Sequence, residues 1–176
     1  VLQLREKDLG VDALPALARD VKALTQKYKA SLIINSRADI ARAVGADGVH
    51  LPENQIASVT EIKKNSPRLL VGVSTHSLES ARKAEALGAD FITFGPIFDT
   101  LSKSEYGPPQ GVEKLREVAR ETGLPVIALG GITPERIPSL LDAGAFGVAM
   151  VSGVWRSANI EKTVFDYIQY FGGKSI

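Results

Sequence analysis

The 176-residue sequence has no cysteine, which excludes disulfide bonds and thiolate catalysis and leads us to expect a cytoplasmic protein. Its 21 basic and 20 acidic residues almost cancel, so the formal net charge of +1 gives no electrostatic reason to expect nucleic acid or a membrane as a partner. No apolar run is long enough to span a bilayer, and no signal peptide leads the chain. The 44% hydrophobic and 23% charged residues that are present are typical of a globular domain with a buried core.

Short apolar runs alternate with longer amphipathic segments along the whole chain. We expect strands at residues 1–5, 31–35, 48–51, 69–74, 91–98, 126–129 and 147–151, and helices at 11–28, 38–44, 56–65, 78–87, 112–122, 134–143 and 160–171. A Gly-Ala phrase at Gly45, Gly88 and Gly144 closes a helix each time, and a new strand follows within a few residues. Repeated strand–helix units are typical of a parallel α/β architecture.

The number of these units decides between two α/β folds. Seven units are present, whereas a (β/α)8 barrel of the TIM type needs eight and typically has about 250 residues. We therefore expect one barrel domain over residues 1–176, with its first strand–helix unit missing from this sequence. The alternative, an open and doubly wound sheet, is disfavoured because no Gly-x-Gly-x-x-Gly motif follows an early strand.

A glycine pair follows the expected strand at 126–129. Gly130 and Gly131 leave the strand end without side chains, so that backbone N–H groups can approach a ligand closely. The Thr-Pro-Glu sequence that begins at Thr133 is typical of a helix start, with Thr133 as the N-cap. A strand, a glycine pair and a helix N-terminus together predict a phosphate-binding turn, and a tight turn without a ligand explains the same pattern equally well.

Polar residues gather at the carboxyl ends of the expected strands, where TIM-type barrels have their active sites. They are Gln3, Arg5, Lys7, Asn35, Ser36, Arg37, His50, Ser74, Thr75, His76, Thr100, Ser102, Lys103, Gly130, Gly131, Ser152 and Gly153. Because alternate residues of a strand point to the same side, Gln3, Arg5 and Lys7 share one side of the strand, where the arginine fork and the lysine point charge are suited to phosphoryl oxygens. A solvated strand end is the competing explanation, and Lys103 on the same rim weakens it. The sequence thus predicts a site rich in phosphate donors and poor in carboxylates.

Seven motifs follow one another at these strand ends. They are Gln3-Leu4-Arg5-Glu6-Lys7, Ile34-Asn35, Gly48-Val49-His50-Leu51, Gly72-Val73-Ser74-Thr75-His76, Gly95-Pro96-Ile97-Phe98 with Thr100-x-Ser102-Lys103, Gly130-Gly131-Ile132 and Val151-Ser152. In this order they resemble the thiamin phosphate synthase/thiazole tautomerase superfamily, over nearly the whole chain. The resemblance implies a barrel that lacks the first strand and helix of that superfamily and a function in thiamin biosynthesis.

The resemblance also implies two sets of ligand contacts. Contacts to a pyrimidine pyrophosphate are implied at Gln3, Arg5, Lys7, Asn35, Ser74 and Lys103. Contacts to a thiazole phosphate are implied at Thr100, Ser102, Gly131, Val151 and Ser152. The expected partner is therefore a small-molecule thiazole phosphate, and the sequence is compatible with an oligomer.

Two positions depart from the synthase pattern that the resemblance implies. Synthases hold Mg²⁺ with one Asp directly after the Asn and another a few residues beyond the His-Leu pair, where this sequence has Ser36 and Gln55. Mg²⁺ prefers hard, usually anionic oxygen ligands, and the loss of both acids removes charge neutralisation that the departure of pyrophosphate needs. Glu53 replaces at most one of them. We therefore expect no cofactor, with Mg²⁺ required only if the chain is a synthase.

Metal-independent thiazole-phosphate tautomerisation, an isomerase reaction, is the function we favour from the sequence. Leu51-Pro52 and Met150-Val151-Ser152-Gly153 resemble the tautomerase branch, whereas Pro96 stands where its catalytic histidine is expected. His76 is the candidate general base, with a structural histidine as an equal alternative, and for His50 the structural role is favoured. The alternatives are thiamin phosphate synthase, which is a transferase, and a non-catalytic regulatory homologue that binds a phosphate ligand.

Overall fold

The computed structural model describes residues 1–6, 8–9, 13–100 and 108–171. The chain forms two compact units, which we describe separately. The N-terminal unit comprises residues 1–74 and 86–90, and the C-terminal unit comprises residues 75–85 and the chain from residue 91 onward. Three predicted ligand contacts, Lys7, Ser102 and Lys103, lie outside the described residues.

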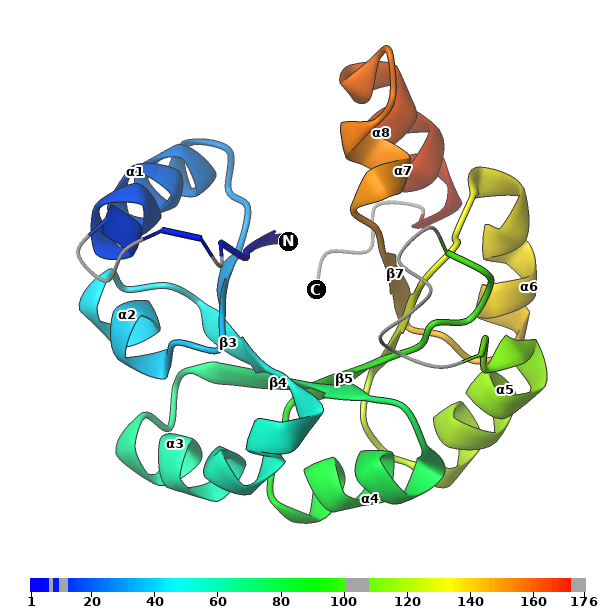
Figure 1. Ribbon diagram of the computed structural model, residues 1–176, viewed down its shortest axis with the longest axis horizontal. Coiled ribbons are helices and arrows are strands. Elements are labelled where there is room, and N and C mark those ends of the chain that lie inside the picture. The colour runs from blue at the N-terminus through cyan, green and yellow to red at the C-terminus, as the bar shows by residue number, and fades with distance from the viewer. Residues whose placement is uncertain (7, 10–12, 101–107, 172–176) are drawn as a thin grey trace. The chain divides into compact units, whose positions relative to one another are not determined.

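The N-terminal unit alternates parallel strands with helices (Figure 1). Its elements are β1 (Leu2–Leu4), α1 (Ala13–Lys27), β2 (Leu32–Asn35), α2 (Ala38–Ala43), β3 (Gly48–Leu51), a 3₁₀ stretch (Glu53–Ser58), α3 (Val59–Asn65) and β4 (Leu70–Thr75, whose last residue belongs to the other unit). The strands pair in chain order, with Ile33 opposite Gly48 and Gly48 opposite Leu70. Helices α1, α2 and α3 all lie on the same face of these strands (Figure 1).

The C-terminal unit repeats the same alternation. Its elements are α4 (Leu78–Ala86, whose last residue belongs to the other unit), β5 (Phe91–Phe94), α5 (Gly111–Glu121), β6 (Val126–Leu129), a 3₁₀ stretch (Pro134–Arg136), α6 (Ile137–Asp142), β7 (Gly147–Ala149), α7 (Ser152–Trp155), α8 (Ile160–Ile168) and a second 3₁₀ stretch (Gln169–Phe171). Strands β5, β6 and β7 again pair in parallel and in chain order. The described residues thus contain the seven predicted strands, each followed by a helix, and the predicted α/β fold of a TIM-type barrel that lacks a unit is confirmed.

The two faces of the N-terminal strands differ in character. The face toward the helices is formed by aliphatic side chains that are at most 1% exposed: Leu32, Ile34, Val49, Leu51, Val71 and Val73. Burial of each such side chain is worth roughly 1.5–3 kcal/mol, which makes this face the main source of cohesion in the unit. Because side chains alternate along a strand, Asn35 and His50 lie on the opposite face of this unit.

The repeated Gly-Ala-Asp phrase has a structural role in both of its full copies. The Asp47 carboxylate accepts hydrogen bonds from the backbone N–H of Leu32 (2.7 Å) and from Lys22 (2.8 Å). In the same way, Asp90 accepts from the N–H of Val71 (2.7 Å) and from Lys63 (2.9 Å). Each aspartate therefore ties the start of one strand to the start of the preceding one. The third copy has Phe146 in place of Asp and keeps only the backbone hydrogen bond, from its N–H to the carbonyl of Val126 (2.8 Å).

Loss of the Asp90 carboxylate should destabilise the N-terminal unit. Asp90→Ala leaves the buried N–H of Val71 without this acceptor, and we expect a loss of about 1–3 kcal/mol in the free energy of unfolding. Asp90→Asn keeps an acceptor oxygen and loses only the charge opposite Lys63, so its loss should be smaller. Urea denaturation of the two variants, with Asp20→Ala on the exposed side of α1 as a control, measures both values. Equal losses in the Ala and Asn variants would contradict a role for the backbone hydrogen bond.

The structure differs from the predictions in local details. The strand expected at 91–98 ends at Phe94, and beyond it the N–H groups of Ile97 and Phe98 bond to the end of β6. Thr133 is the N-cap residue of the 3₁₀ stretch that follows it, as predicted, although its side chain makes no capping hydrogen bond. The short helix α7 was not predicted, because four residues that include a glycine carry no helical periodicity.

No described helix combines the length and the apolar character that crossing a membrane requires.

Candidate functional site

Strand register places four predicted site residues on one face of the N-terminal unit. Asn35 of β2 lies directly opposite His50 of β3, and His50 lies opposite Gly72 of β4. Ser74 follows Gly72 by two residues on β4 and so shares this face. Gln3 of β1 lies opposite Ile33, two residues before Asn35, which puts it on the same face one step lower. The structure therefore brings together Gln3, Asn35, Ser74 and His50 on a single strand face.

Side-chain amides link three of these strands. The Nε2 group of Gln3 donates to Oδ1 of Asn35 (3.1 Å) and lies 3.1 Å from Nδ1 of His50. The Nδ2 group of Asn35 donates to the hydroxyl of Ser36 (3.0 Å). The backbone also links these residues, because the N–H of Ser36 donates to the carbonyl of His50 (2.9 Å). We call Gln3, Asn35, Ser36 and His50 the amide network.

His50 is the most deeply placed member of the amide network. It is 6% exposed, and its burial lowers the pKa of the imidazole to about 4. The ring is therefore neutral at pH 7. A neutral, buried histidine next to an amide is suited to accepting a hydrogen bond and poorly suited to binding a phosphate by charge.

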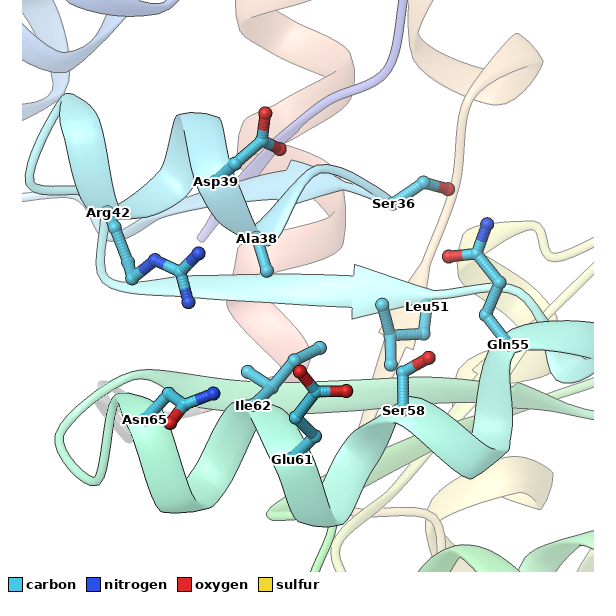
Figure 2. Close-up of a pocket in the computed structure, with 10 residues that line it drawn as sticks. All are labelled: Ser36, Ala38, Asp39, Arg42, Leu51, Gln55, Ser58, Glu61, Ile62 and Asn65. Atoms are coloured by element: carbon cyan, nitrogen blue, oxygen red, sulfur yellow. The ribbon is translucent and has the colours of Figure 1, made fainter.

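The two positions that the resemblance assigns to metal-binding aspartates line one pocket. Ser36 and Gln55 border a groove of about 300 Å³ that runs between α2 and α3 (Figure 2). Of the acids along it, Asp39 forms a two-pronged ion pair with Arg37 (2.9 and 2.6 Å), and the hydrogen bonds from this guanidinium hold the pKa of Asp39 at about 2. Most of the lining comes from the two helices, and Ser36 is the residue that the groove shares with the amide network.

The donors at these positions do not fit Mg²⁺. Ser36 and Gln55 offer neutral oxygens, and the Ser36 hydroxyl already accepts from Asn35. Mg²⁺ is usually held through one or two carboxylates together with phosphate oxygens. Ser36 and Gln55 therefore do not form a Mg²⁺ site in this protein.

In the C-terminal unit, His76 is anchored by its ring. Its Nδ1 lies 2.5 Å from the carbonyl oxygen of Gly95, and because a carbonyl only accepts, Nδ1 carries the proton. The backbone N–H of His76 donates to the hydroxyl of Ser80 (3.3 Å) at the start of α4. The histidine is half-buried and held from both its backbone and its ring.

The glycine pair after β6 is packed against the segment that follows β5. Gly130 and Gly131 both have positive φ, 102° and 63°. A Cβ on Gly131 would lie 2.5 Å from the carbonyl oxygen of Asp99, and one on Gly130 would lie 2.6 Å from the Cβ of Pro96. Tight packing thus requires glycine here whether or not a ligand binds. The role of Gly131 as a phosphate donor remains a prediction.

Arg136 was not among the predicted site residues, yet it holds this turn. Its Nη1 donates to the carbonyl of Gly131 (2.5 Å), and its guanidinium lies 4.3 Å from the centroid of the Phe98 ring. The cation–π contact and the hydrogen bond together fix the glycine turn from the helix that follows it. The sequence offers one indication of this role. Arg136 lies in the first turn after the glycine pair, close enough for its side chain to reach the carbonyl groups of that turn.

The last predicted contacts lie around α7. Val151 is 65% exposed and immediately precedes α7, and Ser152 is its first residue. The hydroxyl of Tyr167 in α8 donates to the carbonyl of Ile132 (2.9 Å), with Gly153 packed close to the same hydroxyl.

Two further predicted contacts lie outside the α7 region. Thr100 is half-buried at the end of the segment 13–100. In the N-terminal unit, Arg5 is exposed directly after β1.

The fold and the polar strand ends define a TIM-type barrel protein with its candidate site at the carboxyl ends of the strands. A sequence profile described as thiamine monophosphate synthase matches residues 1–154, and the chain belongs to this family. The predicted resemblance is therefore confirmed, and membership implies small-molecule substrates.

Named relatives cover most of this chain. It is 53% identical over 152 residues to a protein of Aquifex aeolicus, provisionally named thiamine-phosphate synthase 2, covering 86% of this chain and 81% of that protein. It is 38% identical over 159 residues to the thiamine-phosphate synthase of Moorella thermoacetica, covering 90% of this chain and 76% of the relative. The solved structure of a thiamine phosphate pyrophosphorylase from Pyrococcus furiosus superposes with a TM-score of 0.86 at 30% identity, covering 95% of this chain and 80% of the other.

These relatives overturn the tautomerase interpretation. They bear the name of the synthase, a transferase, and not that of an isomerase. Ser36, Gln55 and the Leu51-Pro52 pair favoured the tautomerase, whereas Pro96 cannot carry out the proton transfer that a tautomerase needs. The role of His76 as a general base was tied to that reaction and is not carried further.

Proposed function

We propose that the chain is a thiamine-phosphate synthase that joins hydroxymethylpyrimidine pyrophosphate to a thiazole phosphate. The observation that carries the proposal is the set of relatives named thiamine-phosphate synthase that match it over about nine-tenths of its length. The strand face that carries Gln3, Asn35 and Ser74 supports it, because this face offers neutral hydrogen-bonding groups for a heterocycle.

The reaction forms a C–N bond and breaks a C–O bond. The thiazole ring nitrogen supplies the electron pair for the new bond to the exocyclic carbon of the pyrimidine, and pyrophosphate leaves with the pair from the broken bond. The task of the protein is to align the two rings and to stabilise the negative charge on the leaving group. No group of the protein needs to remove a proton for the bond to form.

We assign this charge stabilisation to basic residues. Arg5 directly follows β1, and Lys7 and Lys103 are the further cations implied by the resemblance. An arginine fork and a lysine point charge are both suited to pyrophosphate oxygens. The thiazole phosphate is assigned to Thr100, Ser102, Gly131, Val151 and Ser152, where backbone N–H groups and hydroxyls are available. A cytoplasmic location and a single barrel domain remain part of this proposal.

Growth of a thiamine-requiring bacterial strain that lacks its own synthase tests the proposal. We expect the chain to restore growth without added thiamine. A matched strain that lacks the tautomerase instead should not be rescued. Expression of the folded protein without rescue of the first strain would count against the synthase.

Restored acids should raise the affinity for Mg²⁺. Ser36→Asp together with Gln55→Asp puts two carboxylates on the border of one pocket, and we expect at least a tenfold tighter binding of Mg²⁺, on the order of 1.4 kcal/mol or more. Calorimetric titration of the folded variant with MgCl₂ measures this. Ser58→Asp with Asn65→Asp, at other positions on the same groove, is the control. Equal affinity in the two double variants would contradict a metal position at Ser36 and Gln55.

A second candidate function is a non-catalytic regulatory homologue. The neutral Ser36 and Gln55 pair favours it, since a protein that only binds its ligands needs no charge stabilisation for a leaving group. Calorimetry with both phosphate ligands distinguishes the two: binding of both without release of pyrophosphate supports the regulatory homologue.

A further inference from the structure

Both protons of the exposed Gln3 amide are donated to acceptor atoms of the protein. An amide NH₂ group has two N–H donors. One points to Oδ1 of Asn35 and the other to Nδ1 of His50, each at 3.1 Å. The only other polar atom of this side chain is Oε1, which accepts hydrogen bonds. A ligand that touches the Gln3 amide therefore meets an acceptor and must bring an N–H or O–H group.

The protonation of His50 determines which end of the Gln3 amide faces the ring. If Nδ1 carried a proton, it would repel the Nε2 group, and the amide would have to turn over to present Oε1 to the ring. The Nδ1 atom of His50 must then be unprotonated, which places the single proton of the neutral ring on Nε2. The ring of His50 is only 6% exposed, so the Gln3 amide is the hydrogen-bond partner of Nδ1 although the Gln3 side chain itself is exposed.

The orientation of the Gln3 amide also determines the orientation of the next side chains in the amide network. Oδ1 of Asn35 accepts from Gln3, so its Nδ2 is the end that donates, and it does so to the hydroxyl of Ser36. Ser36 is held in place by a left-handed backbone, with φ of 62°, and by its N–H bond to the carbonyl of His50. One histidine thus orients two amides and one hydroxyl on neighbouring strands.

We propose that His50 is a positioning residue whose unprotonated Nδ1 fixes the orientation of the Gln3 amide, and through it that of Asn35 and Ser36. It does so without touching the substrate. The part of the proposal that concerns the pyrimidine substrate rests on the proposed function, which implies Gln3 and Asn35 as contacts to that substrate. The part that concerns the proton on His50 is a property of the free protein.

Nitrogen NMR of the free protein tests the second part. We expect the Nδ1 resonance of His50 at the position of an unprotonated imidazole nitrogen, and the two side-chain N–H resonances of Gln3 protected from exchange with solvent. A protonated Nδ1 would overturn the proposal, because Gln3 would then present its Nε2 group to the ligand. This outcome does not depend on the reaction that the protein catalyses.

Two substitutions test the consequence for binding. His50→Asn keeps an acceptor atom at the same number of bonds from the backbone as Nδ1, and His50→Leu removes it at similar size. We expect His50→Leu to weaken binding of hydroxymethylpyrimidine pyrophosphate by about tenfold or more, and His50→Asn by less than about threefold, as measured by calorimetry. Binding of the thiazole phosphate should change by less than about twofold in both variants.

The thiazole phosphate is the control for general damage. If both variants lose affinity for the two ligands alike, His50 has only a structural role and the proposal fails. If the His50→Leu protein does not fold, the His50→Asn protein still decides: a tenfold loss of pyrimidine binding, with Gln3 N–H resonances that now exchange freely, contradicts the proposal. If wild-type protein binds the thiazole phosphate and not the pyrimidine, the proposed function fails, while the NMR result on Nδ1 stands by itself.

Discussion

Replacement of Gly131 by alanine is expected to lower the free energy of unfolding by about 2–5 kcal/mol. Two costs add. At a φ of 63° any L-side chain is strained, and the new Cβ would also lie 2.5 Å from the carbonyl oxygen of Asp99. Neither the strain nor the contact involves a ligand, so we expect this loss in buffer without phosphate. Urea denaturation of the variant measures it.

Gly45 provides a matched control for the strain alone. Its φ is 64°, and a Cβ there would meet nothing within 4 Å. Gly45→Ala should therefore cost only about 1–2 kcal/mol, and the difference between the two variants gives the cost of the close approach between the glycine turn and residues 98–99. Losses of equal size would show that this turn moves freely and would contradict the packing described above.

Stability should fall in mild acid because His50 is buried. Its pKa is about 4 in the folded protein and about 6.5 when exposed. Between these values the unfolded chain binds a proton that the folded chain excludes, so the free energy of unfolding decreases as the pH falls from 6.5 to 4 and then levels off. The full loss from this group is roughly 3 kcal/mol. It is absent above pH 7, where the ring is neutral in both states.

His50→Asn isolates this contribution, since asparagine does not titrate. Urea denaturation at a series of pH values should show a wild-type curve that falls more steeply than the curve of the variant between pH 6.5 and pH 4. Asp47, whose pKa is lowered because hydrogen bonds from Lys22 and Leu32 outweigh the effect of burial, contributes only at lower pH in both proteins. Parallel curves would mean that water reaches His50 in the folded state.

The buried strands and the polar residues at their carboxyl ends could be predicted from the sequence. The runs around Leu32, Val49 and Val71 predicted buried parallel strands, because strands covered on one face by helices keep their aliphatic residues in register. Strand order then placed Asn35 and His50 side by side. These features depend on spacing along the chain, which the sequence contains directly.

Contacts made by long side chains could not be predicted in the same way. The reach of Arg136 to both Gly131 and Phe98 depends on rotamers and on the segment after β5 lying across the turn. The direction of the Gln3 amide depends on the depth of His50, for which a structural role was favoured from the sequence alone. Neutral Ser36 and Gln55 at the two metal positions favoured a tautomerase, and the relatives named thiamine-phosphate synthase contradict that interpretation.

The most direct measurement is product formation by the purified protein. With hydroxymethylpyrimidine pyrophosphate and thiazole phosphate together, in buffer containing Mg²⁺, we expect thiamine phosphate and pyrophosphate to form in equal amounts, and neither to form when one substrate is omitted. Asn35→Leu should slow the reaction by at least about tenfold, whereas Asn65→Leu, on α3 and away from the strand face, should not. Binding of both substrates without formation of either product would contradict the synthase.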